Sequence, residues 1–482
     1  MLRATLLIVP AGMMLAASTS QPVAATFTSA AVLREHAREA VVAMDKAEHY
    51  QSADSGTLAW GEARVLTAYY WMYEASGDTA WCDRIVGHAD VIFANLSQGD
   101  ELHPGWRTPR YSVALVRASA HPDNESGATI RPDPTRIYDR GTAAEVTGHT
   151  YELRVAPDGT VEVTDTTTAE SIGAADLPRD GRIGRIPGVV VVVEGEPHVG
   201  DRFRVETQAL KPFEYIVHDG MILTPIAKFC AAVLSNDDLA SKYGAAARRY
   251  VEIMETQLLP KWEPYWHELP GGMGVYAFQD DPAQRFPGAS LPHNQYLALG
   301  RTFVALHRIT GKARYRERAR MMGRFFKHNL RLVDEHYEWN YWDYAGPWDE
   351  GARRMAHTED SSHGHIDIGF AVDAYDAGLV FEREDLERFA RTVADVMWNR
   401  SEKEPRLGSH VNTSEGEREH ALDWVRLGRF DERTRQIMVG MLESLSKPGR
   451  RQAAAAAQGL ALEREGWSPQ PRCAGPRATP AD

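Results

Sequence analysis

Apolar residues recur at three- and four-residue steps over most of the chain, the period of a helix with one buried face. The first such segments run from about residue 28 to 96. A glycine is followed four residues later by an aromatic residue at Gly77 and Trp81, and again at Gly311 and Tyr315. These repeated helix–turn–helix units predict stacked helical hairpins. The pattern of roughly ten to twelve candidate helices predicts a mainly α fold, an (α/α) toroid.

The period changes to two between residues 126 and 212. Segments such as 151–155 and 160–164 alternate or are β-branched, with turn residues between them. A small all-β module with an accessory role is therefore expected as an insertion. The expected organisation is a signal peptide (1–25), the first part of the toroid (26–125), the β module (126–212), the second part of the toroid with the active site (213–447) and a weakly ordered, alanine- and proline-rich tail (448–482).

The net charge and the N-terminal residues indicate which classes of protein are compatible with the sequence. The formal net charge of −13 argues against nucleic-acid binding. A basic residue, a short apolar run and small residues at Val23-Ala-Ala25 indicate a secretory signal, so a secreted or periplasmic protein is expected. No later segment is expected to span a membrane. Cys82 and Cys230 lie in helical patterns and are predicted to be buried thiols.

The densest cluster of chemistry-bearing residues is segment 355–367. It holds three histidines, two aspartates and a glutamate, and it leads into an apolar-periodic helix. Backbone N–H groups at a helix N-terminus favour anions and shift nearby pKa values. The segment is therefore a candidate active-site element, with histidines that cap the helix as the alternative. Its residues are His357, Glu359, Asp360, His363, His365 and Asp367, and His365 is expected to bind substrate.

Three other segments carry candidate binding residues. Segment 337–344 holds three tyrosines and two tryptophans, and the faces of Trp339 and Trp342 are expected to stack on sugar rings. His218 either lies in a cleft or caps a helix. His293 either contacts substrate, orients its neighbour Asn294 or packs beneath a turn. Arg301 lies two turns further along the same helix face, where it either binds a substrate carboxylate or forms a surface salt bridge.

These residue types suit β-elimination on a uronic acid. The reaction requires neutralisation of the substrate carboxylate, a base for the neighbouring carbon-bound proton and an acid for the leaving glycosidic oxygen. We assign Asn294 to the first task and His363 with Tyr341 or Tyr344 to the proton transfers. Glu359 is expected to hold the tautomer of His363 or to help bind the carboxyl group.

Three motifs resemble the helical-toroid polysaccharide lyases, particularly the glucuronan/alginate lyase type. They are His218-Asp-Gly-Met-Ile, Leu291-Pro-His-Asn-Gln and Thr358-Glu-Asp-Ser-Ser-His-Gly-His. The resemblance covers roughly residues 30–125 and 214–430. It implies an Asn that neutralises the carboxylate and His and Tyr that transfer protons, matching Asn294, His363 and Tyr341 or Tyr344. The sequence departs from the family pattern because no tyrosine follows Tyr375, so a late catalytic tyrosine is missing.

Three alternatives remain open. His357, His363 and His365, with Asp360 or Asp367, are ligand types for a divalent cation, the one cofactor left open. A glycoside hydrolase would pair Glu359 or Asp360 with Asp219 as acid and base. A non-catalytic glycan-binding protein would use the β module. The expected partner is an acidic polysaccharide substrate.

Overall fold

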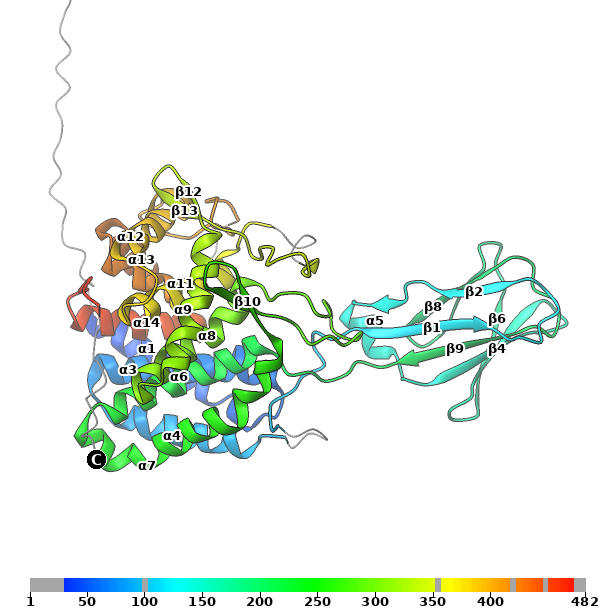
Figure 1. Ribbon diagram of the computed structural model, residues 1–482, viewed down its shortest axis with the longest axis horizontal. Coiled ribbons are helices and arrows are strands. Elements are labelled where there is room, and N and C mark those ends of the chain that lie inside the picture. Colours follow the sequence, from blue (N-terminus) through cyan, green and yellow to red (C-terminus); the bar gives the residue numbers. More distant parts are fainter. Residues whose placement is uncertain (1–29, 98–102, 352–356, 417–421, 445–449, 472–482) are drawn as a thin grey trace, which may run out of the picture.

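The computed structural model describes residues 30–97, 103–351, 357–416, 422–444 and 450–471. A helical part forms the larger body, and a module of β-strands projects from one side of it (Figure 1). Two short hairpins, β10–β11 (Trp266–Leu269, Met273–Tyr276) and β12–β13 (Arg331–Val333, His336–Glu338), lie among the helices. The fold is therefore mixed α and β, and the expected mainly α class is correct only in part.

Helices end where the sequence supplies turn residues. α3 (Ala63–Ser76) ends at Gly77 and α8 (His293–Thr310) ends at Gly311, with φ values of 74° and 67°. Glycine adopts this left-handed conformation without steric cost. Trp81 and Tyr315 are buried early in the next helices, so both predicted helix–turn–helix units are confirmed.

The other helical elements follow in chain order. They are α1 (Ala30–Asp45), η1 (His49–Gln51), α2 (Ser55–Thr57), η2 (Leu58–Glu62), α4 (Ala80–Ala94), α6 (Ile216–Leu234), α7 (Asp237–Ile253), η3 (Met254–Leu258), η4 (Pro260–Tyr265), α9 (Ala313–His328), α11 (Ser361–Asp376), α12 (Arg383–Arg391), η5 (Thr392–Met397), η6 (Leu422–Arg429), α13 (Glu432–Glu443) and α14 (Arg450–Arg464).

Packing contacts lead around the helical part from one element to the next. α3 packs on α6, α6 on α8, α8 on α11, α11 on η6, η6 on α14, and α14 on α3. A second set lies against these elements: α4 on α3, α7 on α6, α9 on α8, α12 on α11, α13 on η6 and α1 on α14. α6, α8 and α11 bury residues on most sides, as expected for helices enclosed by others.

The most apolar of these helices is α6. Contrary to the expectation from sequence, its 19 residues are long and apolar enough to cross a membrane by length and composition. However, 78% of that window is buried inside the fold, between α3, α7 and α8. A core helix of this kind meets the same criterion as a membrane span. Cys230 on α6 and Cys82 on α4 are buried free thiols, as predicted.

The expectation of a weakly ordered tail is wrong for residues 450–464. These residues form α14, which packs on α1, α3 and η6. The five alanines Ala453 to Ala457 are buried, each at most 5% exposed. Alanine has the highest helix propensity, and its small side chain lets a helix approach its neighbours closely. The alanine run is therefore a packing surface. The predicted signal peptide lies outside the described residues.

The β module consists of two antiparallel sheets that share one apolar core. The sheet orders are β3-β1-β9-β4-β5-β6 and β2-β8-β7. Alternate residues such as Tyr151, Leu153 and Val155 point into the core between the sheets. β1 starts before residue 126, so the module begins earlier than the expected boundary. Its elements are β1 (Ala114–Ala120), β2 (Thr129–Pro132), β3 (Arg136–Ile137), α5 (Arg140–Glu145), β4 (Thr150–Val155), β5 (Thr160–Asp165), β6 (Glu170–Asp176), β7 (Arg182–Ile186), β8 (Val189–Glu194) and β9 (Arg202–Gln208).

Gly220 lets α6 and α8 approach closely, and we predict that Gly220→Ala destabilises the protein. A Cβ at this position would lie 2.3 Å from the backbone nitrogen of Leu299 and 2.4 Å from the carbonyl carbon of Ala298. Overpacking of this kind costs about 1–3 kcal/mol. Urea denaturation followed by circular dichroism measures the free energy of unfolding.

The matched control is Gly87→Ala on α4, where a Cβ meets no atom within 4 Å. This substitution should stabilise the protein by about 0.5–1 kcal/mol, because alanine favours a helix over glycine. Equal effects of the two substitutions would contradict the role given to Gly220.

Candidate active site

A pocket of about 240 Å³ lies where the N-terminal ends of α6, α8 and α11 meet. Five of the predicted residues line it: His218, Asn294, Tyr341, Trp342 and His363. Residues far apart in sequence therefore share one cavity. The remaining lining residues are Trp60, Tyr111, Tyr215, Val217, Phe278, Gln284, Arg285, Phe286, Pro292 and Gln295.

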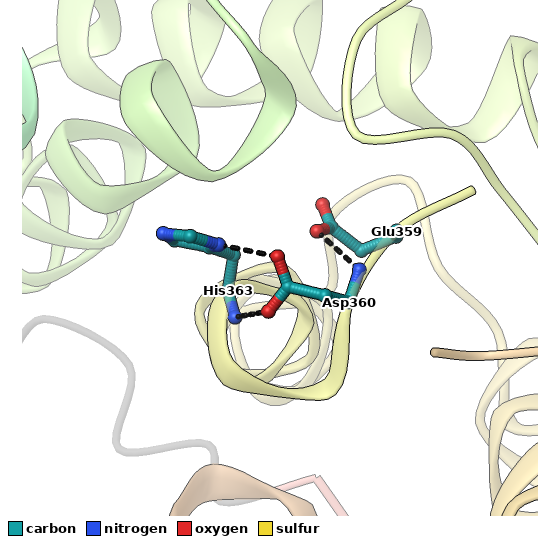
Figure 2. Close-up of side chains that lie close together, drawn as sticks. All are labelled: Glu359, Asp360 and His363. Atoms are coloured by element: carbon teal, nitrogen blue, oxygen red, sulfur yellow. Dashed lines mark hydrogen bonds and ion pairs between the residues drawn. The ribbon is translucent and has the colours of Figure 1, made fainter. Parts of the chain in front are cut away.

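The imidazole of His363 is held by Asp360 (Figure 2). Asp360 is the N-cap of α11 and accepts hydrogen bonds from the backbone N–H groups of Ser362 and His363 at 2.8 and 3.1 Å. Its second oxygen lies 2.6 Å from His363 Nδ1. Burial tends to raise the pKa of Asp360, but the hydrogen bond and charge of His363 outweigh it and hold the pKa well below its usual range. Asp360 thus orients the ring and leaves Nε2 for proton exchange.

Tyr341 lies between two histidines. Its ring stacks on His357 with centroids 5.1 Å apart and meets His363 edge-on at 5.4 Å. Burial and the nearby Glu359 raise the pKa of Tyr341, although Gln295 acts in the opposite direction. The phenol therefore keeps its proton at neutral pH and is a hydrogen-bond or proton donor.

Asn294 and His218 present unpartnered polar atoms in the pocket wall. Asn294 is 2% exposed, and its Oδ1 has no hydrogen-bond partner. His218 is fully buried; its Nδ1 lies 2.8 Å from Ser55 Oγ, and its Nε2 has no partner. Burial lowers the pKa of His218 to about 3, so the ring is neutral at neutral pH. Buried polar atoms normally have partners, so these two are candidates to bind a ligand.

Two predicted binding residues instead belong to a buried charge network. Arg301 donates two hydrogen bonds to Asp423, both at 3.0 Å, and one to Asp373 at 2.9 Å. His365 Nδ1 lies 3.2 Å from Asp423, and burial lowers the pKa of His365 to about 4. Neither residue lines the pocket with Asn294. Arg301 and His365 are therefore held in this charge network, outside the pocket that Asn294 lines, and their substrate-binding role stays a prediction.

Three more predicted residues lie outside the pocket. His293 is 1% exposed, and its two ring nitrogens contact Tyr296 Oη at 2.6 Å and Asp343 Oδ2 at 3.0 Å. The Trp339 indole is fully buried, with its N–H on Asp367, so it offers no face to a sugar. Tyr344 is 39% exposed and does not line the pocket. Of the two candidate tyrosines, only Tyr341 is at the pocket.

Glu359 does not hold the tautomer of His363, because Asp360 occupies Nδ1. The Glu359 carboxyl is fully buried and accepts from the backbone N–H of Asp360 at 2.9 Å. Burial and the charge of Asp367 raise the pKa of Glu359 well above its usual range, and burial raises the pKa of Asp367 to about 6. Among the described residues, Glu359 Oε2 and Asp367 Oδ1 have no hydrogen-bond donor, and the raised pKa values of both carboxyls mean that the pair retains a proton.

The three histidines proposed as metal ligands do not converge. His365 is directed to Asp423, and His357 Nδ1 lies 3.0 Å from the carbonyl oxygen of Thr358. Within the described residues, the ligand-type atoms that gather within 4.8 Å belong to Glu359, Asp360 and His363 (Figure 2). Those atoms already hydrogen-bond to one another or to backbone. The arrangement is that of a helix cap with a bound imidazole.

Sequence reasoning missed several pocket residues. Arg285 comes from the irregular segment before α8, and Tyr111 and Tyr215 come from the two segments that join the β module to the helices. Tyr215 is 6% exposed, with an unpartnered hydroxyl whose pKa is raised by burial. None of the three lies in a periodic pattern or a polar cluster, so the sequence carried no local signal for them.

Comparisons with known proteins yield little. No family model and no curated protein matches the chain. Two crystal structures of Xanthomonas campestris FlgL have 11% and 14% sequence identity to it, and the flagellar junction protein FlgL from Legionella pneumophila has 13%. These alignments cover 47% of this chain and 94%, 93% and 87% of the FlgL chains, each with a TM-score of 0.16. Similarity this low carries no argument about fold or function.

The Glu359–Asp367 pair predicts a stability change with pH. Raised pKa values mean that the folded state holds protons more tightly than the unfolded state. The stabilisation is therefore fully present below the unfolded pKa of about 4 and is lost as pH rises through about 6. The double variant Glu359→Gln/Asp367→Asn cannot ionise. From pH 4 to 7 the free energy of unfolding of the wild type should fall by about 2–3 kcal/mol relative to that of this variant.

Urea denaturation across this pH range measures the difference in free energy of unfolding. A difference that stays constant with pH would contradict the shared-proton account.

Proposed function

We propose that this protein is a polysaccharide lyase that cleaves a uronic-acid-containing glycan, such as glucuronan or an alginate-like polymer, by β-elimination. The observation that carries the proposal is the shared pocket of Asn294, Tyr341 and His363. These side chains are the amide, phenol and imidazole that the reaction requires, and they come from three distant segments. The resemblance to the helical-toroid lyases supports the same assignment.

The hydrogen bonds and surroundings of His363 and Tyr341 assign a proton-transfer role to each side chain. His363 Nε2 takes the proton from the carbon beside the carboxylate, because Nδ1 is occupied by Asp360. The electron pair forms the new carbon–carbon double bond as the bond to the glycosidic oxygen breaks. Tyr341 gives its proton to that oxygen. A proton then returns from His363 to Tyr341, whose rings are 5.4 Å apart, and restores both groups.

We assign carboxylate neutralisation to Asn294, His218 and Arg285, which line the same pocket. The side-chain N–H₂ group of Asn294 is the donor for this task, and its burial strengthens hydrogen bonds to developing charge. His218 adds a neutral imidazole, and the guanidinium of the exposed Arg285 lies near enough to Tyr341 to affect its pKa. Burial of a substrate carboxylate here is compatible with these partners, since anions need paired donors.

The pocket chemistry favours elimination over hydrolysis. A hydrolase of the proposed kind needs two carboxyl groups across the scissile bond. The residues that line the described pocket include no Asp or Glu. Asp219 accepts from the indole N–H of Trp262 at 2.8 Å and pairs with Lys261 at 2.9 Å. Its carboxylate therefore belongs to a separate network.

The (α/α) toroid is our proposal for the helical part. Its support is the circuit of contacts among α3, α6, α8, α11, η6 and α14, each with at least one helix packed against it from outside the circuit. Such a circuit would bring the N-terminal ends of the inner helices to one rim, where the pocket lies. Export through the N-terminal signal peptide belongs to the same proposal, because polymeric substrates lie outside the cell.

The test is a panel of glucuronan, alginate, hyaluronan and pectate, followed by ultraviolet absorbance of the unsaturated product. His363→Ala should lower kcat on the active polymer by at least about 10²-fold, and Asn294→Ala by about 10²–10³-fold. The control is His328→Ala, an exposed residue at the end of α9. Near-normal turnover by either pocket variant in a folded protein would overturn that residue's role. Sugar binding without turnover by wild type would favour the glycan-binding alternative.

Asp360→Asn is a second test, because the amide keeps the shape of the side chain but loses the charge. We expect kcat to fall by about 10²-fold, with KM little changed. The matched control is Asp431→Asn at the N-cap of α13, which changes a helix cap away from the pocket. If both variants retained full activity, Asp360 would have no positioning role.

A further inference from the structure

The base of the β module lies directly beside the pocket. Arg136 on β3 donates a hydrogen bond to the carbonyl oxygen of Gln284, a pocket residue. The guanidinium of Arg140, the first residue of α5, lies 5.0 Å from the ring centroid of Tyr111, which also lines the pocket. The module therefore contacts the pocket wall at two places.

Further contacts hold the β module in place next to the pocket. Thr108 and Phe213, in the two connecting segments, exchange backbone hydrogen bonds of 2.9 and 3.0 Å. Val113 donates its N–H to the carbonyl oxygen of Ala283 at 2.9 Å, and Lys211 pairs with Asp281 at 2.7 Å. The segments that carry the module are thus tied to the loop before α8, which supplies Arg285 to the pocket.

Arg140 and Arg285 are exposed cations in the segments that meet at this junction. Within the described part of the chain, neither has a carboxylate at ion-pair distance, whereas Arg110 nearby pairs with Asp54 at 3.1 Å. Uncompensated guanidinium groups beside a pocket attract anions even when the protein carries a net charge of −13. A guanidinium also binds a carboxylate through two parallel hydrogen bonds.

We propose that Arg140, supported by the ring of Tyr111, forms a subsite on the β module for the carboxylate of a further uronic acid, beyond the two sugars that flank the cleaved bond in the pocket. This inference rests on the proposed function, because it takes the ligand to be a polymer with a carboxylate on each sugar. The module is then part of the substrate-binding cleft and not a separate accessory domain. It sets a preference for chains over single sugars.

The subsite predicts a dependence on chain length. A disaccharide that fills the pocket does not reach Arg140, whereas a longer oligosaccharide does. Loss of the Arg140 charge should therefore weaken binding of long acidic chains by about 10-fold, the value of one charge-assisted hydrogen-bonded pair. It should leave disaccharide binding and thermal stability unchanged.

Isothermal titration calorimetry on the His363→Ala background, which would not consume substrate, measures this directly. The ligands are di-, tetra- and hexasaccharides of the polyuronate that the wild type cleaves. If the wild type cleaves no polyuronate, oligosaccharides of glucuronan and alginate are used. A neutral glucan hexasaccharide is the uncharged control. Arg140→Gln is compared with Arg154→Gln. Arg154 is an exposed arginine on β4 that lies opposite Arg202 at the start of β9, away from the junction.

The possible outcomes distinguish the proposed Arg140 subsite from the proposed elimination reaction. Equal hexasaccharide affinities in Arg140→Gln and Arg154→Gln would overturn the subsite and leave the elimination proposal standing. An equal loss for neutral and acidic chains would also overturn it, because it would show packing and not charge recognition. Weaker acidic binding in Arg140→Gln, without any unsaturated product from the wild type, would support the subsite and refute the elimination. Absence of binding by every polyuronate would overturn both.

Discussion

The candidate site depends on one carboxylate that meets two requirements at once. Asp360 ends the loop before α11 by accepting two backbone N–H groups, and it binds Nδ1 of His363 through its other oxygen. An N-cap of this kind is typically worth about 1 kcal/mol to its helix. Because the cap and the imidazole partner are the same side chain, the start of the helix and the direction of Nε2 are fixed together. The edge-on contact of His363 with Tyr341 follows from that placement.

Charge is distributed unevenly through the helical part. Several buried carboxylates are paired with cations away from the pocket: Asp373 and Asp423 with Arg301 and Arg426, and Asp219 with Lys261. The pocket wall holds neutral polar groups and aromatic rings, with a cation at Arg285. An anionic sugar entering such a pocket meets donors without facing a like charge. This separation is compatible with the acidic ligand that we propose for this acidic protein.

The sequence predicted the helix–turn–helix units at Gly77 and Gly311 because a glycine and a buried aromatic residue recur there. It also singled out Asn294 and His363, since polar residues at helix starts stand out against an apolar period, and Tyr341 as part of the aromatic segment 337–344. The sequence did not predict the surroundings of Arg301. This residue shares a helix face with Asn294 but lies two turns further along α8, where it binds buried aspartates. Arg285 and Tyr111 could not be found, because only the tertiary arrangement brings those irregular segments to the pocket. The alanine run of α14 was predicted to be a weakly ordered tail because of its composition. In the structure it is a helix that packs against neighbouring helices.

The central claim is that Asn294, Tyr341 and His363 together catalyse bond cleavage without water. The most direct measurement is mass spectrometry of the products formed from the active polyuronate in heavy-oxygen water. Elimination predicts new non-reducing ends that are one water lighter than those of hydrolysis and carry no heavy oxygen, while the new reducing ends keep the original glycosidic oxygen. Saturated ends that incorporate heavy oxygen would contradict the account.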